Sequence, residues 1–129
     1  MLKYYLLFML VVFSLSANAQ STRWVFFSEG GDGALHYYDN ESILKHGNRI
    51  EVWYKVIWIN HSEIDYTLAR AFILCGERKM FSHVNYIYYY KDGRYEDKSI
   101  QNLYESELIY NEVYPETNDE VLYNIVCRK

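Results

Sequence analysis

The chain has 129 residues, of which half are hydrophobic and 23% are charged, and its formal net charge is −4. This length and composition are typical of one globular domain and exclude a low-complexity or fibrous chain. The negative charge disfavours nucleic acids and anionic membrane surfaces as partners.

Residues 1–19 have the pattern of a cleaved secretory signal peptide. Lys3 precedes an apolar run, and Ala17-Asn18-Ala19 is the small-x-small pattern that signal peptidases cut. The apolar run is short for a transmembrane anchor. We therefore predict export, with a single domain over residues 20–129 and no transmembrane span in the mature chain. No cysteine follows the cut, so the sequence predicts no lipid anchor. Loss of Lys3 makes the mature chain one unit more negative.

Strand patterns dominate the next part of the chain. In the segment 49–59, every second residue from Ile50 to Trp58 is apolar and is predicted to face the core, whereas the other face is mixed and partly covered. Residues 66–75 could form a helix by propensity, but their length and neighbours favour a strand. The dipeptide Asp92-Gly93 predicts a hairpin turn. Strands are predicted over 24–27, 35–39, 49–59, 66–75, 79–91 and 95–99.

The C-terminal segment changes to a helical pattern. Thr117 and Glu120 have the spacing of a capping box, with Thr117 as the N-cap. Val121, Leu122, Ile125 and Val126 then recur at helical spacing on one face, which is predicted to face the core. The sequence predicts a helix over 118–127 that packs on the sheet. The predicted fold is α+β, with an antiparallel sheet of five or six strands and one C-terminal helix.

The two cysteines, Cys75 and Cys127, are predicted to form a structural disulfide. Exported proteins fold in an oxidising compartment, where a lone pair of cysteines normally becomes a bridge. A C-x-x-C motif and histidines at zinc-finger spacing are both missing from the sequence, which argues against a redox or metal role. A closed loop of about fifty residues stabilises by ~4 kcal/mol in the chain-entropy model. The bridge would fasten the terminal helix to the domain.

The sequence resembles the surface-adhesin E family of Gram-negative exported proteins. The matching elements, in order, are the signal peptide, Trp24, the segment Tyr37-Tyr38-Asp39-Asn40-Glu41-Ser42-Ile43, Gly47, Val52-Trp53, Cys75, the turn from Tyr89 to Gly93, Val113-Tyr114-Pro115, and Val126-Cys127. The resemblance covers essentially the whole mature chain. It implies an exported domain with an antiparallel sheet, a C-terminal helix and one disulfide. It also implies a non-enzymatic adhesin that binds host matrix or serum proteins, located in the periplasm or on the outer-membrane surface.

Tyrosine and basic residues around the Asp92-Gly93 turn suggest a binding surface. Tyrosine and arginine are enriched at interface hot spots. The candidate residues are Tyr89, Lys91, Arg94, Tyr95 and Lys98. The alternative is that most tyrosines fill cross-strand pairs within the sheet. Strict alternation places Tyr86, Tyr88 and Tyr90 on one face with Met80 and Val84, towards the core, and Tyr89 on the other face with His83 and Asn85.

Enzymatic and cofactor chemistry has little support in the sequence. No Gly-x-Ser-x-Gly motif occurs, and His36, His46, His61 and His83 have no metal-site spacing. We therefore expect neither an enzyme nor a cofactor. A second hypothesis follows from the acidic charge and the absence of a lipid anchor: a periplasmic accessory or inhibitor protein that binds a cationic protein such as a lysozyme. The edges of an open sheet would also permit a homodimer.

Overall fold

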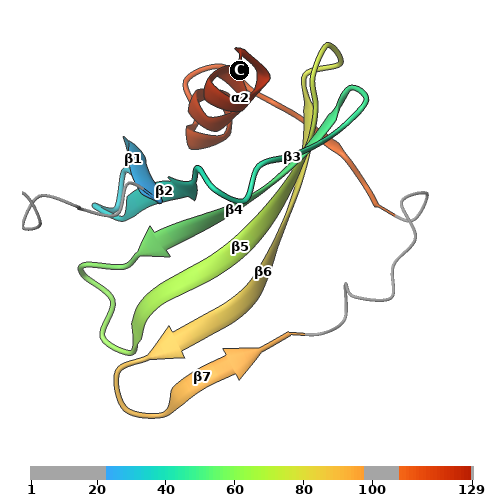
Figure 1. Cartoon of the computed structure of the whole chain (residues 1–129). Helices are drawn as coiled ribbons and strands as arrows, with labels where there is room; N and C mark the ends of the chain where they lie inside the picture. The colour runs from blue at the N-terminus through green and yellow to red at the C-terminus, as the bar shows by residue number, and fades with distance from the viewer. Residues whose placement is uncertain (1–22, 98–107, 129) are drawn as a thin grey trace, which may run out of the picture.

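The computed structural model describes residues 23–97 and 108–128, so the predicted signal peptide and Lys98 lie outside the described residues. The described residues form eight strands and one helix (Figure 1). Their bounds are β1 Trp24–Glu29, β2 Leu35–Asp39, β3 Leu44–His46, β4 Arg49–Ile57, β5 Ile64–Leu74, β6 Lys79–Tyr89, β7 Gly93–Glu96, β8 Asn111–Glu112 and α2 Asn118–Arg128.

All eight strands belong to one antiparallel sheet. Six of them follow the order β1-β2-β4-β5-β6-β7, β3 pairs with β4, and β8 pairs with β6. The predicted count of five or six strands is therefore wrong. β4 pairs with β2 only from Tyr54 to Ile57, and β3 pairs with the beginning of β4. In the same way, β8 pairs with the beginning of β6, whose other end pairs with β7. Strands of three and two residues are too short to give an alternating pattern in the sequence.

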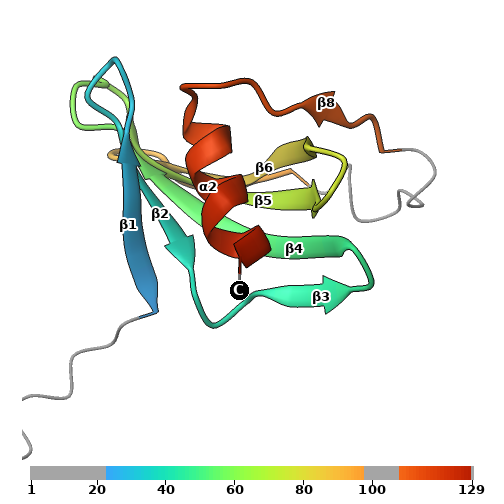
Figure 2. The ribbon, with the colours of Figure 1, turned by 90° about the horizontal axis from the view of Figure 1, so that it is seen from above.

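The helix α2 packs on one face of the sheet, as both views show (Figures 1 and 2). The predicted α+β class and the C-terminal helix are confirmed. The apolar core forms between α2 and the sheet, and Val52, Ile73 and Val126 are completely buried in it. Val121 was predicted to face the core and is instead 36% exposed, whereas Tyr123 is 8% exposed. Tyr123 faces inward because its ring reaches the turn that follows β5.

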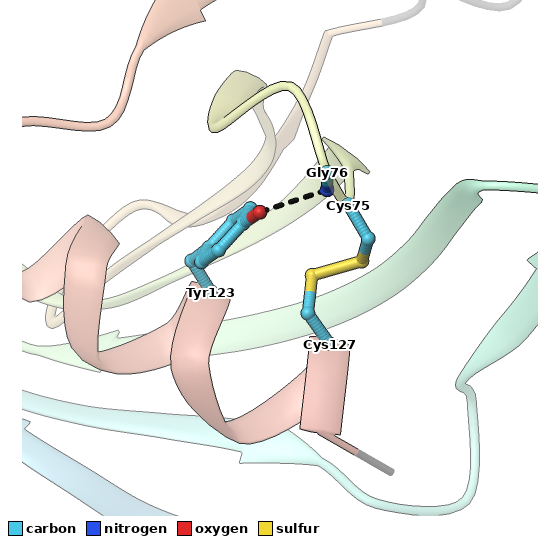
Figure 3. Close-up of a disulfide and its surroundings, with 4 residues drawn as sticks. All are labelled: Cys75, Gly76, Tyr123 and Cys127. Atoms are coloured by element: carbon cyan, nitrogen blue, oxygen red, sulfur yellow. Dashed lines mark hydrogen bonds between the residues drawn. A yellow bond between two sulfur atoms is a disulfide. The ribbon is translucent and has the colours of Figure 1, made fainter.

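The predicted disulfide is confirmed, and a hydrogen bond next to it ties the helix to the same turn (Figure 3). The Cα atoms of Cys75 and Cys127 are 5.6 Å apart. The backbone N–H of Gly76 donates to the hydroxyl of Tyr123 at 3.0 Å. At the other end of α2, the Glu120 N–H donates to Thr117 Oγ1 at 3.2 Å, which confirms Thr117 as the cap. These contacts fix both ends of the helix.

A β-bulge in β6 reverses the direction of its side chains. Val84 pairs with Ala69, and Tyr86 pairs with Leu68, which leaves Asn85 as the extra residue. Since Leu68 and Ala69 are adjacent, Val84 and Tyr86 lie on opposite faces of the sheet. The prediction that Tyr86 and Tyr88 share a face with Val84 is therefore wrong. An inserted residue changes the alternation of every residue after it.

Candidate functional site on the helix-free face

The face of the sheet opposite α2 carries most of the large aromatic and basic side chains of the central strands. No helix of the described residues covers this face (Figure 1). Alternation and register place on it side chains from β1, β4, β5, β6 and β7. We call it the helix-free face. Its principal residues are Arg23, just before β1, and Trp24, Trp53, Lys55, Tyr66, Leu68, Arg70, Tyr86, Tyr88 and Arg94.

The first row of side chains on this face runs from β1 to β6. The guanidinium of Arg23 lies 5.8 Å from the centroid of the Trp24 ring, and Lys55 Nζ lies 4.5 Å from the same centroid. Lys55 Nζ is also 5.3 Å from the centroid of Tyr66. Tyr66 stacks on Tyr88 with a centroid distance of 4.2 Å and an interplanar angle of 17°. Cations and aromatic rings thus alternate along this row, in cation–π and stacking contacts.

The second row has the same composition. The Arg70 guanidinium lies 5.6 Å from the Trp53 centroid, and Trp53 stacks on Tyr86 at 6.1 Å. The guanidinium of Arg94 lies 5.3 Å from the Tyr86 centroid. A hydrogen bond with Tyr88 is the main cause of the raised pKa of Arg94. Arg94 therefore joins the second row to the end of the first.

Carboxylates compensate some of these cations. Arg23 donates from Nε and Nη2 to Asp39 Oδ2 at 3.0 and 2.9 Å, and Asp39 is completely buried. Arg70 forms a 3.0 Å salt bridge with Glu51. Glu96 accepts a hydrogen bond from the Tyr86 hydroxyl and lies near Arg94. The net charge of the helix-free face is therefore small. The positions of the individual charges on this face then decide which ligands it can bind.

Lys55 forms no salt bridge with a described carboxylate, whereas Arg23 and Arg70 each form one. Its pKa is lowered, first by burial and then by the positive charge of Arg23. The two cations approach the same Trp24 ring, and Arg23 is already paired with Asp39. The Arg23 guanidinium lies within electrostatic reach of two carboxylates, Asp39 and Glu41.

A hollow of about 190 Å³ opens beside Trp24. Four side chains give it apolar walls, and the ion pair of Arg23 and Asp39 borders it. A pocket with apolar walls and few polar groups is the usual form of a binding site for a small group. The hollow lies between the two rows. Its lining residues are Arg23, Trp24, Asp39, Trp53, Leu68 and Tyr86.

The sequence-predicted surface residues are divided between the two faces of the sheet. Arg94 pairs with Tyr88 and lies on the helix-free face. Tyr95 pairs with Ile87 and lies on the opposite face with Tyr89, which pairs with Gly93. Tyr95 is 56% exposed, Tyr89 is half-buried, and Lys91 is exposed in the turn. The structure therefore brings Arg94 into the two rows and leaves the other described candidates outside them.

Most residues of the helix-free face were not predicted as a site. The signal that could have indicated them is the mixed second face of residues 49–59, where Trp53 and Lys55 alternate with core residues. Their neighbours in space come from distant strands, so the cluster cannot be read from one segment. Tyr86 and Tyr88 were placed on the wrong face because of the bulge at Asn85.

A second hollow, of about 250 Å³, lies on the other face, at the beginning of α2. Phe27, Tyr54 and Trp58 are among its lining residues, together with His36 and Asp119. Burial lowers the pKa of His36 and raises that of Asp119. Within the described residues, no group of three or more His, Cys, Asp or Glu side chains is placed to hold a metal ion.

Searches of family models, curated proteins and solved structures find no match to this chain. In the described part of the chain, no helix has both the length and the apolar character that a membrane span requires. The candidate site is therefore defined by its geometry alone.

Proposed function

We propose that this chain is a non-enzymatic exported binding protein of the surface-adhesin E type, and that it binds proteins of the host matrix or serum through its helix-free face. The observation that supports the proposal is the pair of rows of aromatic rings and cations in mutual contact on one face of the sheet. Tryptophan, tyrosine and arginine are the residues most enriched at protein-interface hot spots.

The packing of the rings favours a protein over ligands that bind by stacking. Trp24, Trp53, Tyr66 and Tyr86 each have two ring or cation neighbours in the rows. Unpaired nucleic-acid bases bind such residues through free ring faces. Sugars also stack on free ring faces. Rings whose neighbours hold them in place lose little conformational entropy on binding, which suits the anchors of a protein interface.

Binding to a panel of purified matrix and serum proteins tests this function. The mature protein is immobilised on a biosensor, and each panel protein is passed over it at micromolar concentration. The proposal predicts saturable binding of at least one of them. Absence of binding across the panel by a folded, disulfide-bonded sample would refute the adhesin function.

The proposed location on the cell surface requires a separate test. Residues 1–19 resemble a signal peptide, which supports export but does not distinguish the periplasm from the surface. Intact cells are treated with protease and blotted for this protein, with a periplasmic protein as the control. An adhesin is lost from intact cells. Protection until the outer membrane is breached would place the protein in the periplasm.

The net charge of −4 favours a second candidate function, that of a periplasmic accessory or inhibitor protein with a cationic protein partner. Such a partner would bind outside the neighbourhood of Lys55, because like charges repel there. Affinity capture from periplasmic extract tests this function. A cationic protein that is retained equally by the wild type and by Lys55→Glu would support it, and unchanged lysozyme activity would exclude the inhibitor version.

A further inference from the structure

We infer that the second hollow, at the beginning of α2, is a binding site for a small organic amine, in which an ammonium group is carried on an apolar body. The hollow lies on the face of the sheet that bears α2, so the inference goes beyond the proposed function and does not depend on it. The apolar body would occupy the hollow between aromatic side chains. The ammonium group would lie at the rim, beside the carboxylate of Asp119.

The hollow exists because α2 covers only part of its face of the sheet (Figure 2). Val84 of β6 lies on that face and is 40% exposed, whereas Leu122 of α2 is 2% exposed, and both line the hollow. The volume is about 250 Å³. A cavity of about 150 Å³ accommodates benzene. One ring with a short alkyl arm therefore fits between the first turn of α2 and the central strands.

The walls of the hollow suit an apolar body and also tolerate a positive charge. Phe27 of β1, Tyr54 of β4 and Trp58, the residue after β4, contribute aromatic rings to them. Aromatic rings attract cations through their quadrupole, and a cage of several such rings is a recurrent form of site for organic ammonium ions. The same rings bury the apolar body of the ligand.

Asp119 is the polar side chain of the hollow that has no partner of its own. The Trp58 indole donates to Thr67 Oγ1 at 3.3 Å, and Asn118 Nδ2 lies 3.3 Å from His36 Nε2. Among the described residues, no hydrogen bond or salt bridge engages the Asp119 carboxylate. An ammonium group at the rim would supply three donors to this acceptor.

The charges around the hollow favour a cation over an anion. Asp119 and Asp32 both act on His36, and burial lowers the pKa of that ring, so it is neutral near pH 7. Asp119 is also the charge that acts on Tyr54. No lysine or arginine of the described residues contributes to the pKa shifts of these three lining residues. The helix N-terminus supplies about half a positive charge, which is less than the two carboxylates supply in negative charge.

This arrangement makes binding depend on pH. Burial raises the pKa of Asp119, and a bound ammonium group should lower it again, because a nearby positive charge favours the ionised carboxylate. Protonation of either Asp119 or His36 makes the rim more positive. Binding of the amine should therefore weaken as the pH falls.

The test uses the three tryptophans as reporters in nitrogen-15 NMR spectra of the disulfide-bonded protein. Trp58 lines the second hollow, whereas Trp24 and Trp53 lie on the helix-free face. The probes are phenethylamine, the neutral phenethyl alcohol and the anionic hydrocinnamate, which share a phenyl ring and a two-carbon arm. We expect phenethylamine to shift the Trp58 indole signal and to leave those of Trp24 and Trp53 unchanged. The alcohol should bind about tenfold more weakly, because it lacks the charge, and the acid more weakly still.

Variants of Asp119 complete the test. Asp119→Asn should weaken binding of phenethylamine by about tenfold and leave that of phenethyl alcohol unchanged, a difference that a loss of packing alone would not produce. Glu116→Gln is the matched control, because Glu116 is exposed and lies outside the hollow. Equal binding of the amine and the alcohol, stronger binding of hydrocinnamate, or shifts confined to Trp24 and Trp53 would overturn the inference.

Further outcomes identify the source of the ammonium group and separate this inference from the proposed function. Tighter binding of N-acetyllysine amide than of phenethylamine would overturn the free amine in favour of a lysine side chain on a partner protein. Lys55→Glu should bind phenethylamine as the wild type does, because Lys55 lies on the helix-free face. If the panel proteins do not bind but the amine does, the proposed function fails and this site stands. If a panel protein binds while phenethylamine leaves Trp58 unchanged, this inference alone is wrong.

Discussion

The amino group of Lys55 on β4 lies over the ring of Trp24 on β1, at 4.5 Å from the ring centroid, although β2 lies between these two strands in the sheet. Lys55 pairs in register with Tyr37 of β2, so its side chain crosses that strand to reach Trp24. This contact joins the edge of the sheet to its centre on the helix-free face.

The ion pair of Arg23 and Asp39, which borders the hollow beside Trp24, should matter for stability. Asp39 accepts two hydrogen bonds from Arg23 and one from the Glu41 N–H at 3.0 Å, while its side chain is only 1% exposed. Asp39→Asn should lower the free energy of unfolding by about 1–3 kcal/mol. The amide carries no negative charge, so it pairs less strongly with the Arg23 guanidinium. Urea unfolding measures the change. Asp92→Asn in the exposed turn is the control, and equal stability of the two variants would contradict the prediction.

The disulfide should supply a large share of the stability. Cys75 and Cys127 are 52 residues apart, and closing a loop of that length stabilises by ~4 kcal/mol in the chain-entropy model. The double variant Cys75→Ala/Cys127→Ala should therefore unfold at a much lower urea concentration than the oxidised wild type. The reduced wild type serves as the matched control and should resemble the variant. If the double variant and the reduced wild type both lose far less than about 1 kcal/mol of unfolding free energy, the bridge does not constrain the unfolded chain.

The hydroxyl of Tyr123 should contribute separately from the disulfide. It accepts the Gly76 N–H at 3.0 Å, and Tyr123 is 8% exposed. Tyr123→Phe should cost about 1–3 kcal/mol, since the Gly76 N–H then loses its acceptor. The matched control is Tyr114→Phe, because Tyr114 is 65% exposed. Equal urea midpoints for both variants would mean that water replaces the hydroxyl at no cost.

His36 should make the stability depend on pH. Burial lowers its pKa, and its Nε2 lies 3.3 Å from Asn118 Nδ2 while Asn118 Oδ1 accepts from Ser28, so the folded state favours the neutral ring. The unfolded chain then takes up a proton at higher pH than the folded chain does. The contribution of His36 is present above its unfolded pKa of about 6.5 and is lost as the pH falls through that value towards the folded pKa.

The variant His36→Gln should remove this pH dependence. Its urea midpoint should fall less than that of the wild type between about pH 7 and about pH 5. His46→Gln, at an exposed position on β3, should keep the wild-type dependence. An unchanged dependence in His36→Gln would show that another group is responsible.

Local signals predicted the parts of the fold that depend on neighbouring residues. The cap at Thr117, the Asp92-Gly93 hairpin and the disulfide partners are all confirmed. The bulge at Asn85 was not predictable, because it depends on the pairing of β6 with β5. That single residue reverses the faces of Tyr86 and Tyr88.

The candidate site was harder to predict than the fold for a related reason. Its residues are contributed by β1, β4, β5, β6 and β7, and their contacts exist only once the strand order is fixed. The alternation of Trp53 and Lys55 in β4 was visible in the sequence. Its significance depends on Trp24, which β2 separates from β4. The net charge of the chain did not indicate this site either, because an acidic chain carries four cations in these two rows.

The most direct test of the central claim is the binding of Lys55→Glu, compared with Lys91→Glu, to whichever matrix or serum protein the wild type binds in the panel. Both variants make the same change of charge, but only Lys55 lies in the rows of the helix-free face. We predict that Lys55→Glu loses binding by about tenfold or more, whereas Lys91→Glu retains it. Equal affinity of the two variants would show that the helix-free face is not the binding surface.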